Sequence, residues 1–248
     1  MKCSACRPAA GAALLALSVV ACGTTGTTGT TGTTATSGTG TGGAAPRATA
    51  SGPVGNGVAR MSADQAARAA LAALIAASSV HVRGTFTADS RGERFDMRFE
   101  GNSASGSFTV KGAPVQTVTY GGSMYMKAGT DGWTAMGNPP NTAGMMAGRW
   151  FKVGPGSAQP MSPLSLSFFT AEVAAHAKAA QATIRRGTLA GRQVVIITYQ
   201  DGSELYVAIT GPAYPLRFDV AGDTGGQRDF SDYGTAFHIV APTDAIVP

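Results

Sequence analysis

The chain has 248 residues, 13% of them charged, and a formal net charge of +5 at pH 7. Its Lys and Arg residues are scattered rather than clustered, so we expect no nucleic-acid partner. The three cysteines are Cys3, Cys6 and Cys22. Because none lies further along, the rest of the chain contains neither a disulfide framework nor a thiolate metal site.

The first 21 residues have the layout of an export signal. Lys2 and Arg7 precede an uncharged apolar run from Ala9 to Val20, and a small residue follows before Cys22. The run is shorter than the roughly 20 apolar residues that a membrane-spanning helix needs. We therefore predict a signal peptide over residues 1–21.

The stretch Val19-Val20-Ala21-Cys22 resembles a bacterial lipobox. The resemblance implies that the peptide bond before Cys22 is cut and that the Cys22 thiol is acylated, for example with palmitate. Two or more acyl chains anchor a protein stably to a bilayer. We therefore expect a lipoprotein anchored to the extracytoplasmic face of the cell membrane. The alternative is an ordinary secretory signal that happens to contain a cysteine.

Residues 22–58 are predicted to be the lipidated cysteine and a flexible linker. Gly-Thr-Thr repeats dominate it, and no large apolar residue occurs before Val54, so it buries too little surface to offset its chain entropy. A Gly-rich coil of about 35 residues spans roughly 30 to 35 Å. The linker would hold a folded domain, predicted over residues 59–248, away from the membrane.

The folded domain is predicted to open with one amphipathic helix. Ser62 and Gln65 fit a capping box. Apolar residues then recur at helical spacing up to Ser78, namely Ala67, Ala70, Leu71, Leu74 and Ile75. This Leu and Ile stripe needs a partner surface.

From Val80 the apolar residues alternate with polar ones, which indicates strands. We predict an antiparallel meander over residues 80–88, 94–100, 105–111, 115–120 and 123–127. An aromatic- and methionine-rich insert follows, interrupted by prolines and glycines, and we interpret it as a mouth or lid. A second short helix is predicted from Thr170 to about Ala179.

Strands resume after Ala182. They are predicted at residues 182–187, 192–200, 203–210, 215–220, 227–231 and 235–240. Asp201-Gly202 is a strong hairpin signal for a type I′ turn. The run from Val194 to Ile197 is apolar on both faces, as expected of a strand covered on both sides.

No catalytic sequence motif is present, so we predict neither an enzyme nor a cofactor nor a metal site. The three histidines, His81, His176 and His238, are far apart in the sequence. We interpret them as structural histidines. Asp229 and Asp232 could suggest a metal site or an acid pair, but a turn-capping role is the simpler interpretation.

Several strand and turn signatures of the C-terminal half are similar to those of actinobacterial envelope lipoproteins of the LppX and LprG type. They are the segments 201–208, 215–217, 230–234 and 240–242, together with Ser79-Val80 and Gly84. The resemblance implies an α+β fold of the LolA type, a curved antiparallel half-barrel of about ten strands with helices packed on its concave face. In several members an apolar cavity holds the acyl chains of a lipid or glycolipid.

The strands and the insert carry more apolar bulk than one thin sheet-on-helix layer needs. We predict that an apolar cavity is lined by Phe86, Met97, Phe99, Phe108, Met124, Met126, Trp133, Met146, Trp150, Ile197, Leu205, Val207 and Leu216. The expected function is therefore a monomeric, membrane-anchored carrier that binds an acyl lipid or glycolipid.

Two alternatives remain open from the residues alone. One is a non-enzymatic interaction or sensor module with a packed core, which an exposed patch of Trp133, Met145, Met146 and Trp150 would favour. The other is a hydrolase of envelope lipids or glycans, which would need a histidine within reach of a serine and a carboxylate in a cleft.

Overall fold

The computed structural model describes residues 55–88, 91–154, 165–178, 181–223 and 225–247. The predicted signal peptide, Cys22 and nearly all of the predicted linker lie outside these residues, and so does part of the predicted insert. Within the described residues, no helix is long and apolar enough to cross a membrane.

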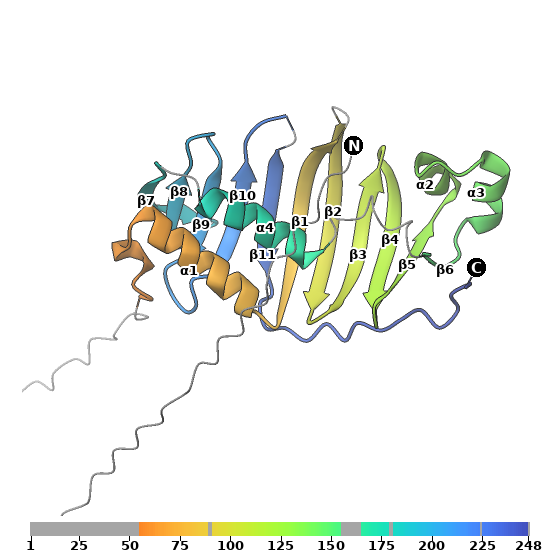
Figure 1. The fold of residues 1–248 in the computed structure, drawn as a ribbon, viewed down its shortest axis with the longest axis horizontal. Helices are drawn as coiled ribbons and strands as arrows, with labels where there is room; N and C mark the ends of the chain where they lie inside the picture. Colours follow the sequence, from red (N-terminus) through yellow and green to blue (C-terminus); the bar gives the residue numbers. More distant parts are fainter. Residues whose placement is uncertain (1–54, 89–90, 155–164, 179–180, 224, 248) are drawn as a thin grey trace, which may run out of the picture. The chain divides into compact units, whose positions relative to one another are not determined.

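A single antiparallel sheet organises the fold (Figure 1). Within the part of the chain that the structure describes, its eleven strands lie in the order β6-β5-β4-β3-β2-β1-β11-β10-β9-β8-β7, so β6 and β7 are the edges and the sheet is not closed. The strands are β1 (Ser79–Ala88), β2 (Arg91–Glu100), β3 (Ser103–Val110), β4 (Ala113–Tyr120), β5 (Ser123–Ala128), β6 (Phe151–Lys152), β7 (Thr183–Leu189), β8 (Arg192–Thr198), β9 (Glu204–Ala208), β10 (Pro215–Val220) and β11 (Gly226–Ser231). The predicted α+β fold with an open, curved half-barrel is confirmed.

Two meanders meet in the middle of this sheet. β1 to β6 lead to one edge and β7 to β11 return from the other, so the first strand pairs with the last. In that pair Val82 faces Phe230 and Gly84 faces Arg228. A Cβ atom on Gly84 would lie 1.8 Å from the carbonyl oxygen of Gln227. Only glycine lets the two strands approach this closely.

Helices contribute to the apolar cluster on the inward face of the sheet, here called the inward cluster. They are the short turn η1 (Val58–Arg60), α1 (Ala63–Ala76), α2 (Thr130–Ala135), α3 (Pro140–Met146) and α4 (Leu166–Ala177). α1 contacts β8, β9, β10 and α4, whereas α2 contacts β3, β4, β5 and α3. Figure 1 shows α1 and α4 across one half of the sheet and α2 and α3 beside β5 and β6.

α1 begins as predicted and buries most of the predicted stripe, with Ile75 as the exception. The Ser62 hydroxyl accepts a hydrogen bond from the Gln65 backbone, and the Gln65 side chain accepts one from the Ser62 backbone, which completes the capping box. The buried face consists of Ala63, Ala66, Ala67, Ala70 and Leu74. Ile75, expected on this face, is 63% exposed. Small alanine side chains let the helix backbone lie close to the sheet.

α4 starts earlier than the sequence suggested. Its N-cap is Ser165, whose hydroxyl accepts from the Phe168 backbone at 3.3 Å, so the expected cap at Thr170 is wrong. The earlier start places Phe169 inside the helix and in the inward cluster. Its ring centroid lies 5.3 Å from that of Phe95 and 6.3 Å from that of Phe230. These aromatic contacts join α4 to both meanders.

A buried ion pair also holds α4 on the sheet. Arg228 on β11 points inward and is only 2% exposed. Its Nε and Nη2 atoms donate to the two carboxylate oxygens of Glu172 at 3.1 and 2.9 Å, and its Nη1 donates to the carbonyl of Thr85 at 3.1 Å. The guanidinium charge is thus paired in a fork geometry within an apolar face.

The C-terminal segment is not the strand predicted over residues 235–240. After β11, Asp232 and Gly234 both have positive φ angles, which turn the chain out of the ladder. Tyr233 then stacks on Tyr214, with ring centroids 3.8 Å apart. The segment ends beside β6, where the backbone N–H of Lys152 donates to the carbonyl of Ile246 at 2.8 Å (Figure 1). β6 itself was not predicted, because its two residues carry too short a pattern.

We expect the substitution Arg228→Met to lower the free energy of unfolding by about 3 kcal/mol, because it leaves the Glu172 carboxylate, only 15% exposed, without its partner. The matched control is Arg185→Met, which breaks the exposed pair with Glu204 and should cost about 1 kcal/mol or less. Urea unfolding measures both.

The double variant Arg228→Met with Glu172→Met should recover most of that loss, because no charge is left unpaired. Equal losses for Arg228→Met and Arg185→Met would contradict a structural role for the buried pair.

Candidate functional site

Most of the residues predicted to line a cavity come together on the inward face. Buried within the inward cluster are Met97, Phe99, Phe108, Met126, Trp133, Ile197, Leu205 and Val207. Phe86, Met124 and Met146 are half-buried and pack against its edge. The two predicted groups of strands therefore contribute to one continuous apolar surface.

Two predicted lining residues are placed differently. Trp150 is half-buried just before β6, with the Lys127 ammonium 5.9 Å from its ring centroid, which is a cation–π contact. Leu216 is half-buried beside the irregularity of β10 between Pro215 and Arg217. Neither belongs to the inward cluster.

The aromatic residues at the middle of the cluster were missed as site residues. Phe169, Tyr199 and Phe230 are all buried there. The adjacent pair Phe168-Phe169 was the available signal, because two aromatic residues in an amphipathic helix usually include one that faces the core.

The patch proposed for an interaction module does not form as expected. Trp133 is buried and packs edge-on against Phe151, with ring centroids 5.7 Å apart. Met145 is 70% exposed, whereas Met146 and Trp150 are half-buried. Because α2 turns its tryptophan towards the sheet, the described part of the insert exposes Met145 rather than an aromatic patch.

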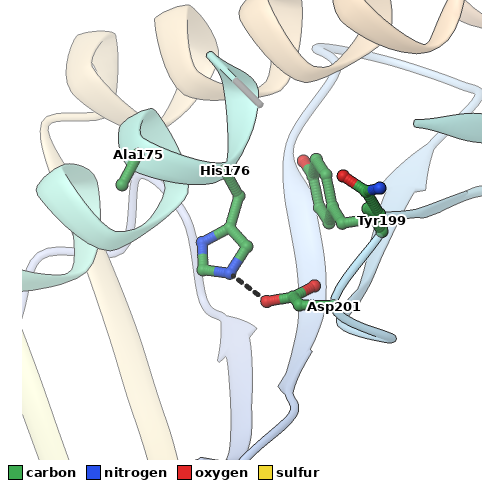
Figure 2. Close-up of a pocket in the computed structure, with 5 residues that line it drawn as sticks. Ala175, His176, Tyr199 and Asp201 are labelled. Atoms are coloured by element: carbon green, nitrogen blue, oxygen red, sulfur yellow. Dashed lines mark hydrogen bonds and ion pairs between the residues drawn. The ribbon is translucent and has the colours of Figure 1, made fainter. Parts of the chain in front are cut away.

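A hollow of about 460 Å³ lies between the last turns of α4 and the β8–β9 turn (Figure 2). It is lined by Ala175, His176, Tyr199, Gln200 and Asp201. Figure 2 shows His176 and Tyr199 reaching it from the helix and the strand, with Asp201 beneath them. The hollow was not predicted, since its residues lie in two separate segments.

The β8–β9 turn fixes the position of Asp201. Only Gly202 of the predicted Asp201-Gly202 pair has a positive φ angle, so the turn is not type I′. The backbone of Gly202 donates to the carbonyl of Tyr199, and the backbone of Tyr199 donates to that of Ser203. The Ser203 backbone and hydroxyl both donate to the Asp201 carboxylate, at 3.0 and 2.9 Å.

His176 closes one side of the hollow. Its Nδ1 lies 2.9 Å from the carbonyl of Glu172, and its Nε2 lies 3.1 Å from the carboxylate of Asp201. Both partners only accept hydrogen bonds, so the doubly protonated ring is the form that makes both bonds. A cation in the last turn of α4 also interacts favourably with the helix dipole.

The surroundings shift the pKa of two side chains in the hollow, Asp201 and Tyr199. Partial burial of Asp201 opposes ionisation, but hydrogen bonds from Ser203 and His176 outweigh it and hold the pKa of this carboxyl below its usual value. Burial raises the pKa of the Tyr199 hydroxyl well above its usual value, and the carboxylates of Asp201 and Asp64 add to the shift. Tyr199 is therefore a neutral hydrogen-bond donor.

The second histidine cluster lies at the junction of the two meanders. His81 is buried between two carboxylates, with Nε2 2.7 Å from Asp96 and Nδ1 3.1 Å from Asp232. The hydroxyl of Ser231 lies 3.5 Å from the same Nδ1. The bond to His81 is the main reason that the pKa of Asp232 is lowered.

This arrangement differs from a serine nucleophile with its base. Both ring nitrogens of His81 face carboxylates, so neither is left to accept the proton of Ser231. Asp229 is paired with Arg217 at 2.7 Å rather than with Asp232. Among the described residues, no group of three or more His, Cys, Asp or Glu side chains could hold a metal ion.

Comparison with solved structures finds proteins of similar fold. LprF from Mycobacterium bovis matches with a TM-score of 0.51 and 20% identity, over 73% of this chain and 96% of LprF. The lipoprotein LppX from Mycobacterium tuberculosis matches with a TM-score of 0.48 and 16% identity, over 72% of this chain and 98% of LppX. No protein-family model and no curated protein matches the chain. The LprF match confirms the fold that the resemblance implied.

We expect the contribution of Asp201 to stability to depend on pH. Its pKa is lower in the folded chain than the value near 3.9 of an unfolded one, so its stabilisation is complete above about pH 5 and disappears as the pH falls through the folded-state pKa. Asp201→Asn should therefore lower the free energy of unfolding by about 1 kcal/mol at neutral pH and by progressively less in acid.

Chemical denaturation of both proteins across pH 2.5 to 7 measures this difference, with the exposed Asp223→Asn as the matched control. A difference that is independent of pH would contradict the role assigned to the ionised carboxylate.

Proposed function

We propose that this chain is a membrane-anchored envelope lipoprotein that binds the acyl chains of a lipid or glycolipid between the inward face of its sheet and the helices, for lipid transport. The observation that carries the proposal is the inward cluster, which is continuous from Met126 on β5 to Ile197 on β8. An open sheet leaves this apolar face to be covered by helices and, in the proposal, by acyl chains.

Partly exposed apolar side chains at the edge of the cluster support this role. Phe86, Met124, Met146 and Phe168 all pack against the cluster and all retain exposed surface. Covering such surface is favourable by about 25 cal/mol per Å². The flexible thioether side chains of methionine adapt to chains of varying shape.

The energetics of acyl chains suit a binding function without covalent chemistry. Each CH₂ group transferred from water contributes about 0.8 kcal/mol, so even one long chain offsets the loss of motional freedom on binding. The predicted anchor and linker would keep the carrier near the membrane from which its ligand comes. In this scheme the protein shields the acyl chains from water after they leave the bilayer, and this shielding is what makes transport possible.

The first test is native mass spectrometry of the chain after Cys22, purified without detergent and then extracted with organic solvent. We expect a stoichiometric acyl lipid. A clean protein mass that stays clean after incubation with diacyl lipids would contradict the proposal and favour the packed-core interaction module.

A pair of neighbouring substitutions locates the bound chains. Met124 packs against the inward cluster, whereas Tyr125 is outside it on the same strand. Met124→Glu should weaken lipid binding at least tenfold and so lower the lipid occupancy, because tenfold corresponds to about 1.4 kcal/mol and a carboxylate in an apolar site costs more. Tyr125→Glu should leave occupancy unchanged. Equal occupancy in both variants, with matched thermal unfolding, would place the lipid elsewhere.

The anchor is tested by metabolic labelling with an alkyne analogue of palmitate in a bacterial host. We expect label on the wild-type chain in the membrane fraction, none on Cys22→Ala, and full label on the control Cys6→Ala, since Cys6 leaves with the predicted signal. Absence of label from the wild type would instead indicate an ordinary secretory signal.

A further inference from the structure

Cations line the outer face of the sheet along the first meander. The outer face is the side opposite the inward cluster, away from α1 and α4 (Figure 1). Successive residues of a strand point to opposite faces, so the residues next to the buried positions of β2, β5 and β6 point outward. Arg94 and Arg98 on β2 are exposed, and Lys127 on β5 and Lys152 on β6 are half-buried. We call these four residues the basic face.

The cations of the basic face have no carboxylate partner. Among the described residues, none of the four forms an ion pair. The Lys127 ammonium instead lies 5.9 Å from the centroid of the Trp150 ring. Two carboxylates share the outer face of β2, namely Asp96, which is 2.7 Å from His81, and Glu100 at the end of the strand. Cations therefore outnumber carboxylates here, and their charge is available to a partner.

The outer face of the second meander differs. There Arg185 pairs with Glu204 at 3.0 Å, and Arg217 pairs with Asp229 at 2.7 Å. Arg83 on β1, at the boundary between the meanders, lies opposite Asp229 in the register of the sheet. The central cations of that half are thus already offset by carboxylates, whereas those of the basic face are not.

The basic face is too wide for one small anion. Arg98 and Lys152 belong to one row across the sheet, which runs through Ser105, Val118 and Tyr125. Four strand spacings of about 4.8 Å separate the backbones at the ends of this row by roughly 19 Å. A single phosphate cannot meet cations so far apart. A surface that carries many anionic groups can.

Aromatic side chains lie among these cations. Tyr125 stands between Val118 and Lys152 in the row, and Tyr120 at the end of β4 is 44% exposed. Tyr and Trp side chains gather where a bilayer meets water, because each combines an apolar ring with a polar group. The predicted anchor at Cys22 would also keep a bilayer at high local concentration, within the roughly 30 to 35 Å reach of the predicted linker. These features favour a bilayer over a nucleic acid or an acidic protein.

We propose that the basic face docks on the surface of an anionic bilayer, where Arg94, Arg98, Lys127 and Lys152 meet the phosphate groups of the lipids. This inference concerns the outer face of the sheet. It is independent of the acyl chains proposed to bind on the inward face.

The test measures how the chain after Cys22, which contains every described residue and lacks the anchor, co-sediments with lipid vesicles. Vesicles of phosphatidylcholine are compared with vesicles that also carry about 30% phosphatidylglycerol. We expect at least tenfold tighter binding to the anionic vesicles in about 0.1 M salt. Most of this preference should disappear in about 1 M salt, because the screening length falls from about 10 Å to about 3 Å.

Charge reversal locates the contact. Arg94→Glu with Arg98→Glu should weaken binding to the anionic vesicles at least tenfold, because each cation at an anionic surface contributes about fivefold. The matched control, Arg186→Glu with Arg192→Glu, changes the net charge equally on exposed residues of β7 and β8 and should weaken binding less than threefold.

A milder second variant guards against loss of folding in the double reversal. Lys127→Gln with Lys152→Gln introduces no new charge and should still weaken binding to the anionic vesicles at least fivefold. Thermal unfolding of each variant shows whether the comparison is made on folded protein.

The outcomes separate this inference from the proposed function. Equal binding to the two kinds of vesicle, or equal losses in the two double reversals, overturns docking through the basic face. Binding to polyglutamate as tight as to anionic vesicles also overturns it and indicates an acidic protein partner. Arg94→Glu with Arg98→Glu should keep the copurified acyl lipid, so a failure to bind vesicles leaves the proposed function standing. A wild-type chain that binds anionic vesicles but never an acyl lipid overturns only the proposed function.

Discussion

The pairing of Glu172 with Arg228 is the constraint on which the arrangement of the inward face depends. Apolar packing through Phe169 draws α4 onto the sheet, but the hydrophobic effect has no direction and leaves the helix free to slide or rotate. Two charge-assisted hydrogen bonds in a fork geometry remove that freedom. One turn later His176 bonds the carbonyl of Glu172 and reaches Asp201, so the pair also sets the wall of the hollow.

The two faces of the sheet carry different interactions where β1 pairs with β11. Inward side chains at the junction of the meanders combine apolar packing, as in the pair of Val82 with Phe230, with the buried Arg228 that pairs with Glu172. On the other face, the neighbouring His81 lies within hydrogen-bond distance of Asp96 and of Asp232, and Asp232 begins the C-terminal segment. One antiparallel sheet can carry both sets of interactions because successive residues of a strand point to opposite faces. The junction between the first and the last strand is thus held on one face by packing and by the Arg228–Glu172 pair, and on the other by the hydrogen bonds of His81.

The fold alone does not identify a ligand, because one fold carries many functions. What narrows the proposal is the contrast between two neighbouring environments. The inward cluster consists of apolar residues, whereas the adjoining hollow is lined by His176, Asp201 and Gln200 beside the ring of Tyr199.

The sequence by itself determined the features that depend on neighbours along the chain. The capping box of Ser62 and Gln65 joins groups three residues apart, and the strands up to β5 follow from a period of two. For the same reason the apolar inward residues Met97, Leu205 and Val207 could be predicted. The export signal and Cys22 lie outside the described residues and remain predictions of the sequence.

Only the tertiary structure decided which distant groups meet. Glu172 and Arg228 are 56 positions apart, and His176 and Asp201 are 25 apart, so no local pattern marks either pair. Residues 235–240 have the alternation of a strand, yet the positive φ angles of Asp232 and Gly234 take them out of the sheet. Periodicity reports which side of an element is apolar. It does not report its partner, because the partner is set by the closure of long loops and by the packing of the whole core.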